Sequence, residues 1–381
     1  MNTYFNPVHT FQGFGCLEQL PSLAASTAIP GKNILLLVWD EGVLTRPGIR
    51  DLQNFEKARV ITRVFSASNP ELGQLWQVYA ETRELDIGLV VAVGGGSVLD
   101  VGKSLCCLYG KPLSSEEDLR KMIAAKAYGT PSCRWIGVPT TAGTGSEVTC
   151  WATIWDSQNG VKYSVDTSEN YAFAAVVDPQ LAATMPLGLA VSSALDAVAH
   201  ATESYWANAT NTVSRGLALE AIRTIMGHID QLLADGSSQE AHDQMAKGSM
   251  LAGLAFSNTR TTACHSISYP LTMHYHIPHG TAVVIERMRE RAQGNGILDI
   301  DATILKLNFP TIQDADALLR AFGAERPEQI GQRVTAILKA AGHPVTLREW
   351  GITEDELPVL AAHGITKGRA DNNPVELTET V

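Results

Sequence analysis

The feature of this sequence that most constrains its fold is a strand pattern that leads directly into three glycines and then into a helical pattern. The run IGLVVAV (87–93) is rich in β-branched residues, and GGGSVLDVGKSL (94–105) follows it. Further strands are predicted at NILLLVWD (33–40), ARVITRVF (58–65) and WIGVP (135–139), with helices at 43–57 and 71–85. This alternation predicts a parallel sheet with helices on both faces.

The pattern changes in the second half of the chain. From LGLAVSSALDAVAHATESYWA, which starts at residue 187, helical patterns follow one another and β-branched runs become scarce. We therefore predict an α/β domain with a parallel sheet over residues 1–186 and an all-α domain over residues 187–381. A length of 381 residues fits two domains of ordinary size.

Composition excludes several classes of protein. The net charge is −11 and no basic stripe is present, so nucleic acid is not an expected partner. No apolar run is long enough to span a membrane, and the N-terminus MNTYFNPVHTFQGFG does not resemble a signal peptide. The six cysteines form no CxxC pair, which favours a reducing compartment. We expect a cytoplasmic protein without a membrane or nucleic-acid partner.

The glycine-rich turn is a candidate phosphate site. Gly94, Gly95, Gly96 and Ser97 stand between a predicted strand and a predicted helix, where glycines admit a close ligand and free N–H groups attract phosphate. The spacing is GGGS and departs from GxGxxG, so a tight turn without a ligand is the alternative.

A second segment of small residues, VPTTAGTGSEVT (138–149), also follows a predicted strand. Two such strand ends in one parallel sheet favour a single ligand across both, although a polar surface loop is the alternative. Asp40 ends the predicted strand at 33–40, where a carboxylate accepts hydrogen bonds from a ribose and repels a 2′-phosphate. Unless it is an ordinary loop aspartate, Asp40 therefore favours NAD(H) over NADP.

A metal site is indicated by residues on two separate segments. Asp196 and His200 are four residues apart, which places them on one face of a helix. By themselves they favour a hydrogen-bonded pair that stabilises the helix. The stretch HSISYPLTMHYHIPHG adds His265, His274, His276 and His279, and two of these would complete a site for Fe²⁺ or Zn²⁺. The residue types alone do not choose which two.

Four motifs in order carry a family resemblance: GGGSVLD, PTTAGTGSEVT, DAVAHATES and an H-x13-H pattern that ends in PHG. The chain resembles the iron-containing (group III) alcohol dehydrogenases over nearly its whole length. The resemblance implies an active site between the two domains, with NAD(P) and a divalent metal. It implies the metal ligands Asp196, His200, His265 and His279. The implied cofactor-binding residues are Asp40, Gly94, Gly95, Gly96, Ser97, Asp100, Thr140, Thr141, Thr144 and Ser146.

Two departures from the family pattern bear on chemistry. Tyr269 stands where relatives usually carry a second histidine, so proton delivery is predicted to involve Tyr269, bound water or the cofactor ribose, beside His279. Arg260 and Thr261 replace residues that are commonly apolar, and a guanidinium there could bind an anionic substrate unless it faces solvent. Arg369 is a second candidate, and His274 is expected in the pocket wall.

These departures, together with the segment GRADNNPVEL (368–377), resemble the branch of the family that acts on phosphonates. The predicted function is a metal-dependent, NAD(H)-linked aldehyde reductase, with phosphonoacetaldehyde and 2-hydroxyethylphosphonate as a candidate substrate pair, and the resemblance implies a homodimer. Two alternatives stay open: an NAD- and Zn²⁺-binding lyase resembling dehydroquinate synthase, and a nucleotide-binding sensor without catalysis. Of these three functions, only the reductase consumes added NADH in step with aldehyde.

Overall fold

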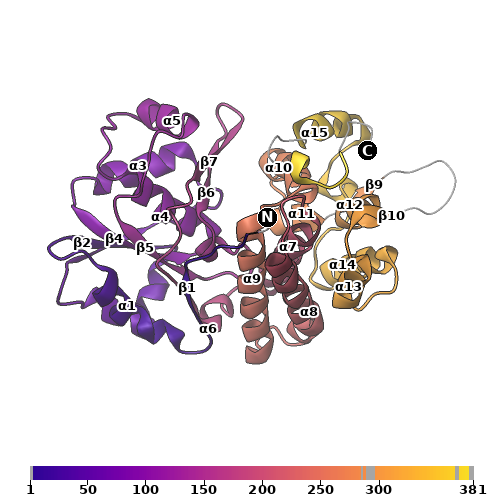
Figure 1. Cartoon of the computed structure of the whole chain (residues 1–381), viewed down its shortest axis with the longest axis horizontal. Coiled ribbons are helices and arrows are strands. Elements are labelled where there is room, and N and C mark those ends of the chain that lie inside the picture. Colours follow the sequence, from indigo (N-terminus) through magenta and orange to yellow (C-terminus); the bar gives the residue numbers. More distant parts are fainter. Residues whose placement is uncertain (1–2, 285, 289–296, 365–368, 377–381) are drawn as a thin grey trace. The chain divides into compact units, whose positions relative to one another are not determined.

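The computed structural model describes residues 3–284, 286–288, 297–364 and 369–376 (Figure 1). The chain divides into two compact units. The α/β unit comprises Asn6–Thr141 and Ser146–Ala182, and the helical unit comprises Met1–Phe5, Ala142–Gly145 and Ala183–Val381. In the part of the chain that is described, no helix combines the length and apolarity that a membrane crossing needs.

The α/β unit is built on a six-stranded parallel sheet in the order β1-β8-β5-β4-β2-β3. All eight residues of β4 are buried, as expected for a central parallel strand with both faces covered. A separate antiparallel hairpin is formed by β6 and β7. The strands are β1 (His9–Gln12), β2 (Asn33–Val38), β3 (Val60–Val64), β4 (Ile87–Gly94), β5 (Arg134–Pro139), β6 (Trp151–Asp156), β7 (Val161–Asp166) and β8 (Ala174–Val177).

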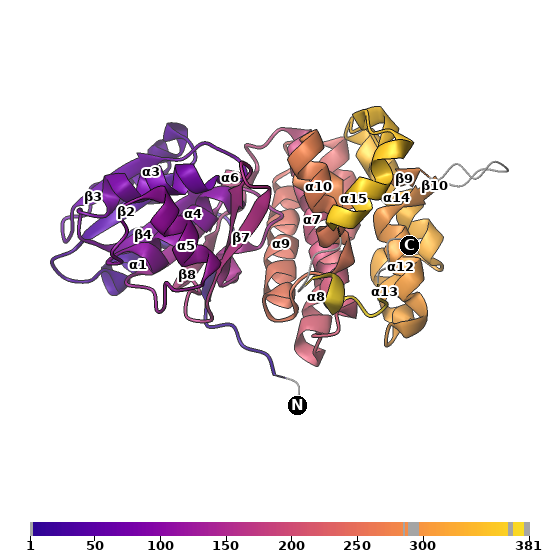
Figure 2. The ribbon, with the colours of Figure 1, turned by 90° about the horizontal axis from the view of Figure 1, so that it is seen from above.

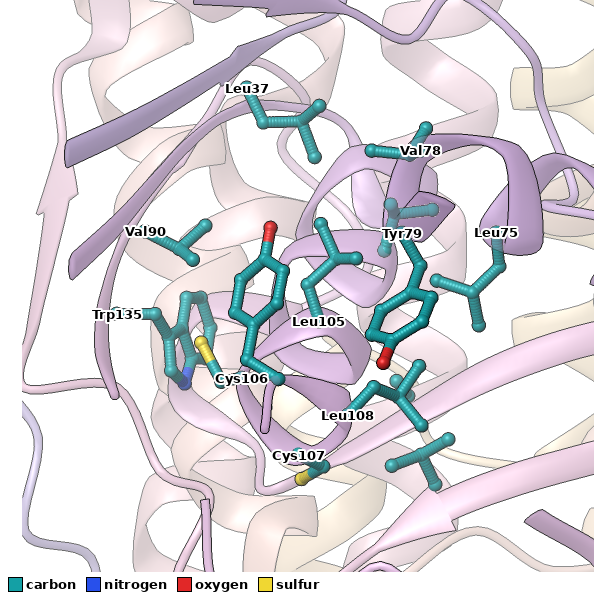
Figure 3. Close-up of a cluster of buried hydrophobic side chains, with 14 of the residues drawn as sticks. Leu37, Leu75, Val78, Tyr79, Val90, Leu105, Cys106, Cys107, Leu108 and Trp135 are labelled. Carbon is teal, nitrogen blue, oxygen red and sulfur yellow. The ribbon is translucent and has the colours of Figure 1, made fainter. Parts of the chain in front are cut away.

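Alternate residues of the strands face two separate cores. Leu35, Leu37 and Val90 pack with α3 and α4 on one face, whereas Leu36 and Val91 pack with α1 and α2 on the other. Figure 1 shows α1 on one side of the sheet and α3 and α5 on the other, and Figure 3 shows part of the first core. The helices of this unit are α1 (Leu20–Thr27), α2 (Pro47–Gln53), α3 (Leu72–Thr82), α4 (Gly96–Leu108), α5 (Glu116–Ala124) and α6 (Pro179–Ala182).

The predicted helix over residues 43–57 was wrong in its extent. The chain instead forms a 3₁₀ turn at Glu41–Thr45 and a separate helix, α2, that begins at Pro47. Arg46 is extended (φ −67°, ψ 138°), because a residue before proline is kept out of the helical region and proline favours the first helical position. Strands β1 and β8 and the β6–β7 hairpin were not predicted, since they are short or lack a continuous β-branched run.

The helical unit confirms the predicted change of character. Helix α7 begins at Leu187, directly after Pro186, and packs against α8 and α9, which lie beside it in both views (Figures 1 and 2). A short antiparallel pair, β9 (Glu286–Met288) and β10 (Ile297–Asp299), departs from the all-helical expectation. The helices are α7 (Leu187–Trp206), α8 (Thr212–Ala234), α9 (Gln239–Thr259), α10 (Ala263–Tyr275), α11 (His279–Val284), α12 (Ile300–Asn308), α13 (Ala315–Phe322), α14 (Pro327–Ala340) and α15 (Leu357–Gly364).

Candidate active site

The predicted cofactor residues follow the carboxyl ends of neighbouring strands. Asp40 comes after β2, the glycine turn after β4 and Thr140 after β5, and these three strands are adjacent in the sheet. The strand that follows β2 along the chain lies on one side of it, whereas β4 lies on the other. Such a reversal of strand order leaves a crevice at the carboxyl ends, where open α/β sheets bind their ligands.

The glycine turn leaves backbone donors available. Gly95 caps α4 without a side-chain hydrogen bond, so the first N–H groups of this thirteen-residue helix have no side-chain cap. A Cβ at Gly95 would lie 3.3 Å from Cγ2 of Thr141. The Thr141 hydroxyl is buried and has no hydrogen-bond partner in the part of the chain that the structure describes. Free N–H groups beside an unpaired hydroxyl fit a pyrophosphate.

The other predicted cofactor residues, Asp40, Ser97 and Thr144, lie in different surroundings. Asp40 is exposed, and its Oδ1 accepts a hydrogen bond from the Gly42 N–H at 2.7 Å. The Ser97 hydroxyl accepts from the Asn69 N–H at 3.0 Å. Thr144 belongs to the helical unit, as part of Ala142–Gly145. That segment packs closely, because a Cβ at Gly143 would lie 2.6 Å from the Ser193 carbonyl oxygen of α7.

Asp100 and Ser146 are held by a buried network around Lys103. The Ser146 hydroxyl donates to Asp100 Oδ1 at 2.7 Å, and the Thr153 N–H donates to Oδ2 at 2.8 Å. Lys103 is fully buried and donates to Ser146 Oγ, Thr149 Oγ1 and the Trp151 carbonyl at 2.7 to 2.9 Å. These bonds join the segment after β5 to α4, a role that local sequence patterns did not reveal.

The predicted metal ligands converge in the helical unit. Ligand atoms of Asp196, His265 and His279 all lie within 4.8 Å of one another. From Asp196 Oδ1, His265 Nε2 is at 3.4 Å, His200 Nδ1 at 3.9 Å and His279 Nε2 at 4.0 Å. Ligands of a tetrahedral ion at 2.0–2.1 Å stand about 3.4 Å apart. The spacing is therefore close to that of a bound divalent cation.

Local packing explains how these residues meet. Asp196 and His200 lie one turn apart on α7, and the His200 ring stacks between Phe256 and His265, with its centroid 4.2 Å from each. His279 begins α11, which packs on α7. A Cβ at Gly280 would lie 2.3 Å from the Ser192 carbonyl oxygen, so only glycine allows this approach. The PHG signature thus brings the His279 imidazole to Asp196.

Three atoms of the cluster that could ligate a metal have no hydrogen-bond partner among the described residues. Asp196 Oδ1, His200 Nδ1 and His265 Nε2 are buried and have no hydrogen-bond partner. A buried polar atom without a partner costs free energy, and a metal ion would satisfy all three. The His279 side chain is 33% exposed, whereas those of Asp196, His200 and His265 are buried. The donor set therefore fits a divalent metal.

Glu203 orients His265 from one further turn along α7, and the sequence reasoning missed it. Its Oε2 is hydrogen-bonded to His265 Nδ1. Its Oε1 accepts from the Thr262 hydroxyl at 2.8 Å and the Cys264 N–H at 2.6 Å. A carboxylate on the remote nitrogen of a ligating histidine fixes the tautomer and leaves the other nitrogen to the metal. Its spacing of seven residues from Asp196 on one helix face was the available signal.

The electrostatics of the cluster also favour a cation. Burial opposes ionisation of Glu203, but His265 and the Thr262 hydroxyl lower its pKa to about 2. Burial lowers the pKa of His200 to about 4 despite Asp196, so this ring is neutral and can act as a ligand. Burial disfavours a charge on His265 as well, yet Glu203 and Asp196 raise its pKa to about 9. A divalent cation can replace the proton that these carboxylates hold on His265.

Of the remaining predicted residues, Tyr269 and Thr261 are buried, whereas His274 is exposed. The Tyr269 ring stacks against His279, with the centroids 6.2 Å apart, and burial raises its pKa to about 12 although Arg369 opposes the shift. Thr261 is buried and accepts a hydrogen bond from Arg369. His274 is exposed at the end of α10, where its ring lies 6.3 Å from that of His363.

Arg260 ends α9 with φ 65° and ψ −178°, a conformation that non-glycine residues seldom adopt. Its side chain is partly buried. A role for Arg260 in substrate binding stays a prediction, as does that of His274.

Comparison with known proteins identifies the family. Residues 7–179 match the iron-containing alcohol dehydrogenase model, and residues 190–381 match the C-terminal model of the same family. The 1,3-propanediol dehydrogenase of Klebsiella pneumoniae is 30% identical over 354 residues, which cover 90% of this chain and 88% of that protein. The sulfoacetaldehyde reductase of Bilophila wadsworthia is 32% identical over 214 residues, covering 56% of this chain and 54% of that protein.

The fold agrees with solved structures. The sulfoacetaldehyde reductase of Bifidobacterium kashiwanohense, solved in complex with NAD+, superposes with a TM-score of 0.84 at 22% identity, covering 100% of this chain and 96% of that chain. The predicted α/β and helical architecture and the family resemblance are thus confirmed. The chain belongs to the iron-containing alcohol dehydrogenase family, and it is an oxidoreductase of alcohols and aldehydes with a nicotinamide dinucleotide and a divalent metal as cofactors.

Proposed function

We propose that this protein is an NAD(H)-linked reductase of a small anionic aldehyde, with phosphonoacetaldehyde and sulfoacetaldehyde as candidate substrates. The observation that carries the catalytic part is the convergence of buried, unpaired donor atoms on Asp196, His200 and His265. The anionic substrate is supported by two similar proteins that are sulfoacetaldehyde reductases. The homodimer and the cytoplasmic location are further parts of the proposal.

The proposed cofactor is NADH. The backbone N–H groups at Gly95 and Gly96 would bind the pyrophosphate, beside the unpaired hydroxyl of Thr141. Asp40 Oδ1 is occupied by the Gly42 N–H, whereas Oδ2 has no hydrogen-bond partner among the described residues and can accept from ribose hydroxyls. The same carboxylate would repel the 2′-phosphate of NADPH.

The proposed metal ligands are Asp196, His200, His265 and His279. Fe²⁺ or Zn²⁺ at these residues supplies Lewis-acid polarisation of the aldehyde oxygen. Glu203 keeps the proton of His265 on Nδ1, so that Nε2 faces Asp196. NADH bound at the glycine turn would supply the hydride that the aldehyde carbon accepts. The aldehyde is thereby reduced to the alcohol while NADH becomes NAD+.

Tyr269 is the proposed proton donor to the substrate oxygen. Its phenol lies in the buried interior of the helical unit beside His279, and burial raises its pKa to about 12. The hydroxyl therefore keeps its proton at neutral pH and can donate to an alkoxide, which is a much stronger base. A general acid of this kind contributes roughly a hundredfold or more to the rate, so Tyr269→Phe should lower kcat by about that factor.

A panel assay tests the proposed function. Purified protein with Fe²⁺ or Zn²⁺ is given NADH or NADPH together with phosphonoacetaldehyde, sulfoacetaldehyde or propionaldehyde, and absorbance of the reduced cofactor is followed. We expect higher kcat/KM with NADH and with the two anionic aldehydes. Equal turnover of charged and uncharged aldehydes would refute the anionic substrate, and metal binding without turnover of any aldehyde would favour the sensor.

A further inference from the structure

The C-terminal segment places one arginine beside the proposed proton donor. Arg369 Nη1 donates a hydrogen bond to Thr261 Oγ1 at 2.9 Å. Its guanidinium carbon lies 5.2 Å from the centre of the Tyr269 ring, and that ring stacks on His279. Thr261 also hydrogen-bonds the Tyr269 side chain. Arg369 is thus two contacts away from a proposed metal ligand, although it is 90 residues distant from His279 in the sequence.

An asparagine holds this segment in place. Asn372 Nδ2 donates to the Thr259 carbonyl at 2.8 Å and to the Thr261 carbonyl at 3.1 Å, so one amide spans the backbone on both sides of Arg260. The Asn372 carbonyl in turn accepts from the Asn208 N–H at 2.9 Å. These bonds hold the segment that contains Arg369 against the end of α9 and the residues that follow it, including Thr261.

The Arg369 guanidinium has N–H donors that the described residues do not use. It has five N–H donors, and Thr261 takes one of them. Over the ranges that the structure describes, no carboxylate forms an ion pair with Arg369. Arg120, in contrast, is paired with Glu116, Glu117 and Asp156. Stacking on the Tyr269 ring uses the face of the guanidinium and leaves its edges available to a planar or tetrahedral anion.

We infer that Arg369 is the residue that determines specificity for the anionic head group of the substrate, through charge-assisted hydrogen bonds to a phosphonate or sulfonate. This inference rests on the proposed function and names its recognition element. The hydrogen bond to the Thr261 hydroxyl positions the guanidinium of Arg369, and stacking on the Tyr269 ring fixes the orientation of its plane. Because Tyr269 also contacts His279, an anion bound to Arg369 lies near the proton donor and the proposed metal site.

The inference is tested with Arg369→Gln, which keeps a hydrogen-bonding amide but removes the charge, and with Arg369→Lys, which keeps the charge but removes the fork. KM and kcat are measured with phosphonoacetaldehyde, sulfoacetaldehyde and propionaldehyde. Arg369→Gln should raise KM for the two anions roughly tenfold to a hundredfold, the range for a lost hydrogen bond to a charged group, and should change KM for propionaldehyde much less. Arg369→Lys should recover part of the loss.

Two controls accompany these variants. Arg320→Gln removes an arginine of the same unit whose side chain is 68% exposed on α13, and it should change neither substrate class. Arg260→Gln tests the other candidate, and a larger anion-specific loss there than in Arg369→Gln would overturn the assignment. Equal losses on charged and uncharged aldehydes in Arg369→Gln would also overturn it. Bound metal and Tm are measured on each variant, so that a folding defect is recognised.

Ethylphosphonate separates failure of this inference from failure of the proposed function. As an inhibitor it needs no turnover of an anionic aldehyde. If the wild type shows no preference for anionic aldehydes but ethylphosphonate inhibits it and inhibits Arg369→Gln at least tenfold less, the anion site stands and the proposed substrate falls. If ethylphosphonate inhibits wild type and Arg369→Gln equally, or inhibits neither, Arg369 is not an anion site.

Discussion

The two units bury charge in opposite ways. In the α/β unit, Lys103 is fully buried and each of its three N–H donors has an acceptor, while Asp100 lies 3.5 Å away. In the helical unit, Asp196 is also buried, but among the described residues its Oδ1 has no hydrogen-bond partner, and neither do the facing nitrogens of His200 and His265. One cluster is complete within the protein, whereas the other needs a ligand to be complete.

This difference separates a structural role from a functional one. A buried charge whose hydrogen bonds are all made stabilises the segment that supplies its acceptors, here the chain after β5. A buried group that lacks a partner costs stability unless a ligand satisfies it. Burial of a charge alone would therefore not have distinguished Lys103 from Asp196. The four predictions below test this distinction, beginning with the largest expected effect.

Replacing Asp196 by alanine should abolish metal binding and lower aldehyde reduction by roughly a thousandfold or more, since the Lewis acid contributes several kcal/mol to such reactions. Bound metal is measured by mass spectrometry, and turnover by NADH oxidation. Asp230→Ala, at a carboxylate that is 66% exposed on α8, is the matched control and should retain both metal and activity. Full metal content in Asp196→Ala would remove Asp196 from the ligand set.

Replacing Lys103 by methionine should destabilise the α/β unit by about 3–5 kcal/mol, because the change leaves buried acceptors and the partly buried Asp100 without their cation. Thermal and urea unfolding measure the loss. Metal content of folded protein should not change, since Lys103 belongs to the other unit. Lys121→Met, at a lysine whose side chain is 72% exposed, is the control and should leave the transition in place. Loss of metal without loss of stability in Lys103→Met would contradict the structural role.

Replacing Glu203 by glutamine should weaken metal affinity roughly tenfold to a hundredfold, as found when a carboxylate behind a histidine ligand is removed. The shape of the side chain is kept, so the hydrogen bond to His265 weakens without leaving a cavity. Competition with a chelator measures the affinity. An unchanged affinity would show that Glu203 acts only on the folding of α10.

Replacing Glu147 by glutamine tests whether a buried carboxyl group of the α/β unit lowers stability when it ionises. Burial raises the pKa of Glu147 to about 7, with Lys103 opposing the shift. The folded state then binds more protons than the unfolded state between about pH 4.5 and pH 7, so stability falls as pH rises through that window. At about 1.36 kcal/mol per pKa unit over this window of about 2.5 units, the expected change is on the order of 3 kcal/mol.

Unfolding of the wild type and of Glu147→Gln at pH 5 and pH 8 measures this effect. The variant should be more stable than the wild type at pH 8 and close to it at pH 5, because a neutral amide carries no ionisation cost. The same difference between the two proteins at both pH values would mean that Glu147 does not titrate in this range.

Local patterns were sufficient for much of the α/β unit. The central strands β2, β4 and β5 are continuous apolar runs, and the glycine turn after β4 lies between strand and helix as predicted. Edge strand β1 was missed because His9–Gln12 is short and polar. The helix predicted over 43–57 is interrupted at Arg46, because Pro47 keeps the preceding residue extended and starts a new helix.

The sequence by itself determined the two kinds of unit, the strand-turn-helix around Gly95 and the pairing of Asp196 with His200, because periodicity and turn chemistry act between residues close in the chain. Only the tertiary structure decided that His265 and His279 approach Asp196 while His274 is exposed, that Glu203 bonds His265, and that Arg369 lies over the Tyr269 ring. The physical reason is packing between distant helices, which depends on contacts such as that of Gly280 with the Ser192 carbonyl.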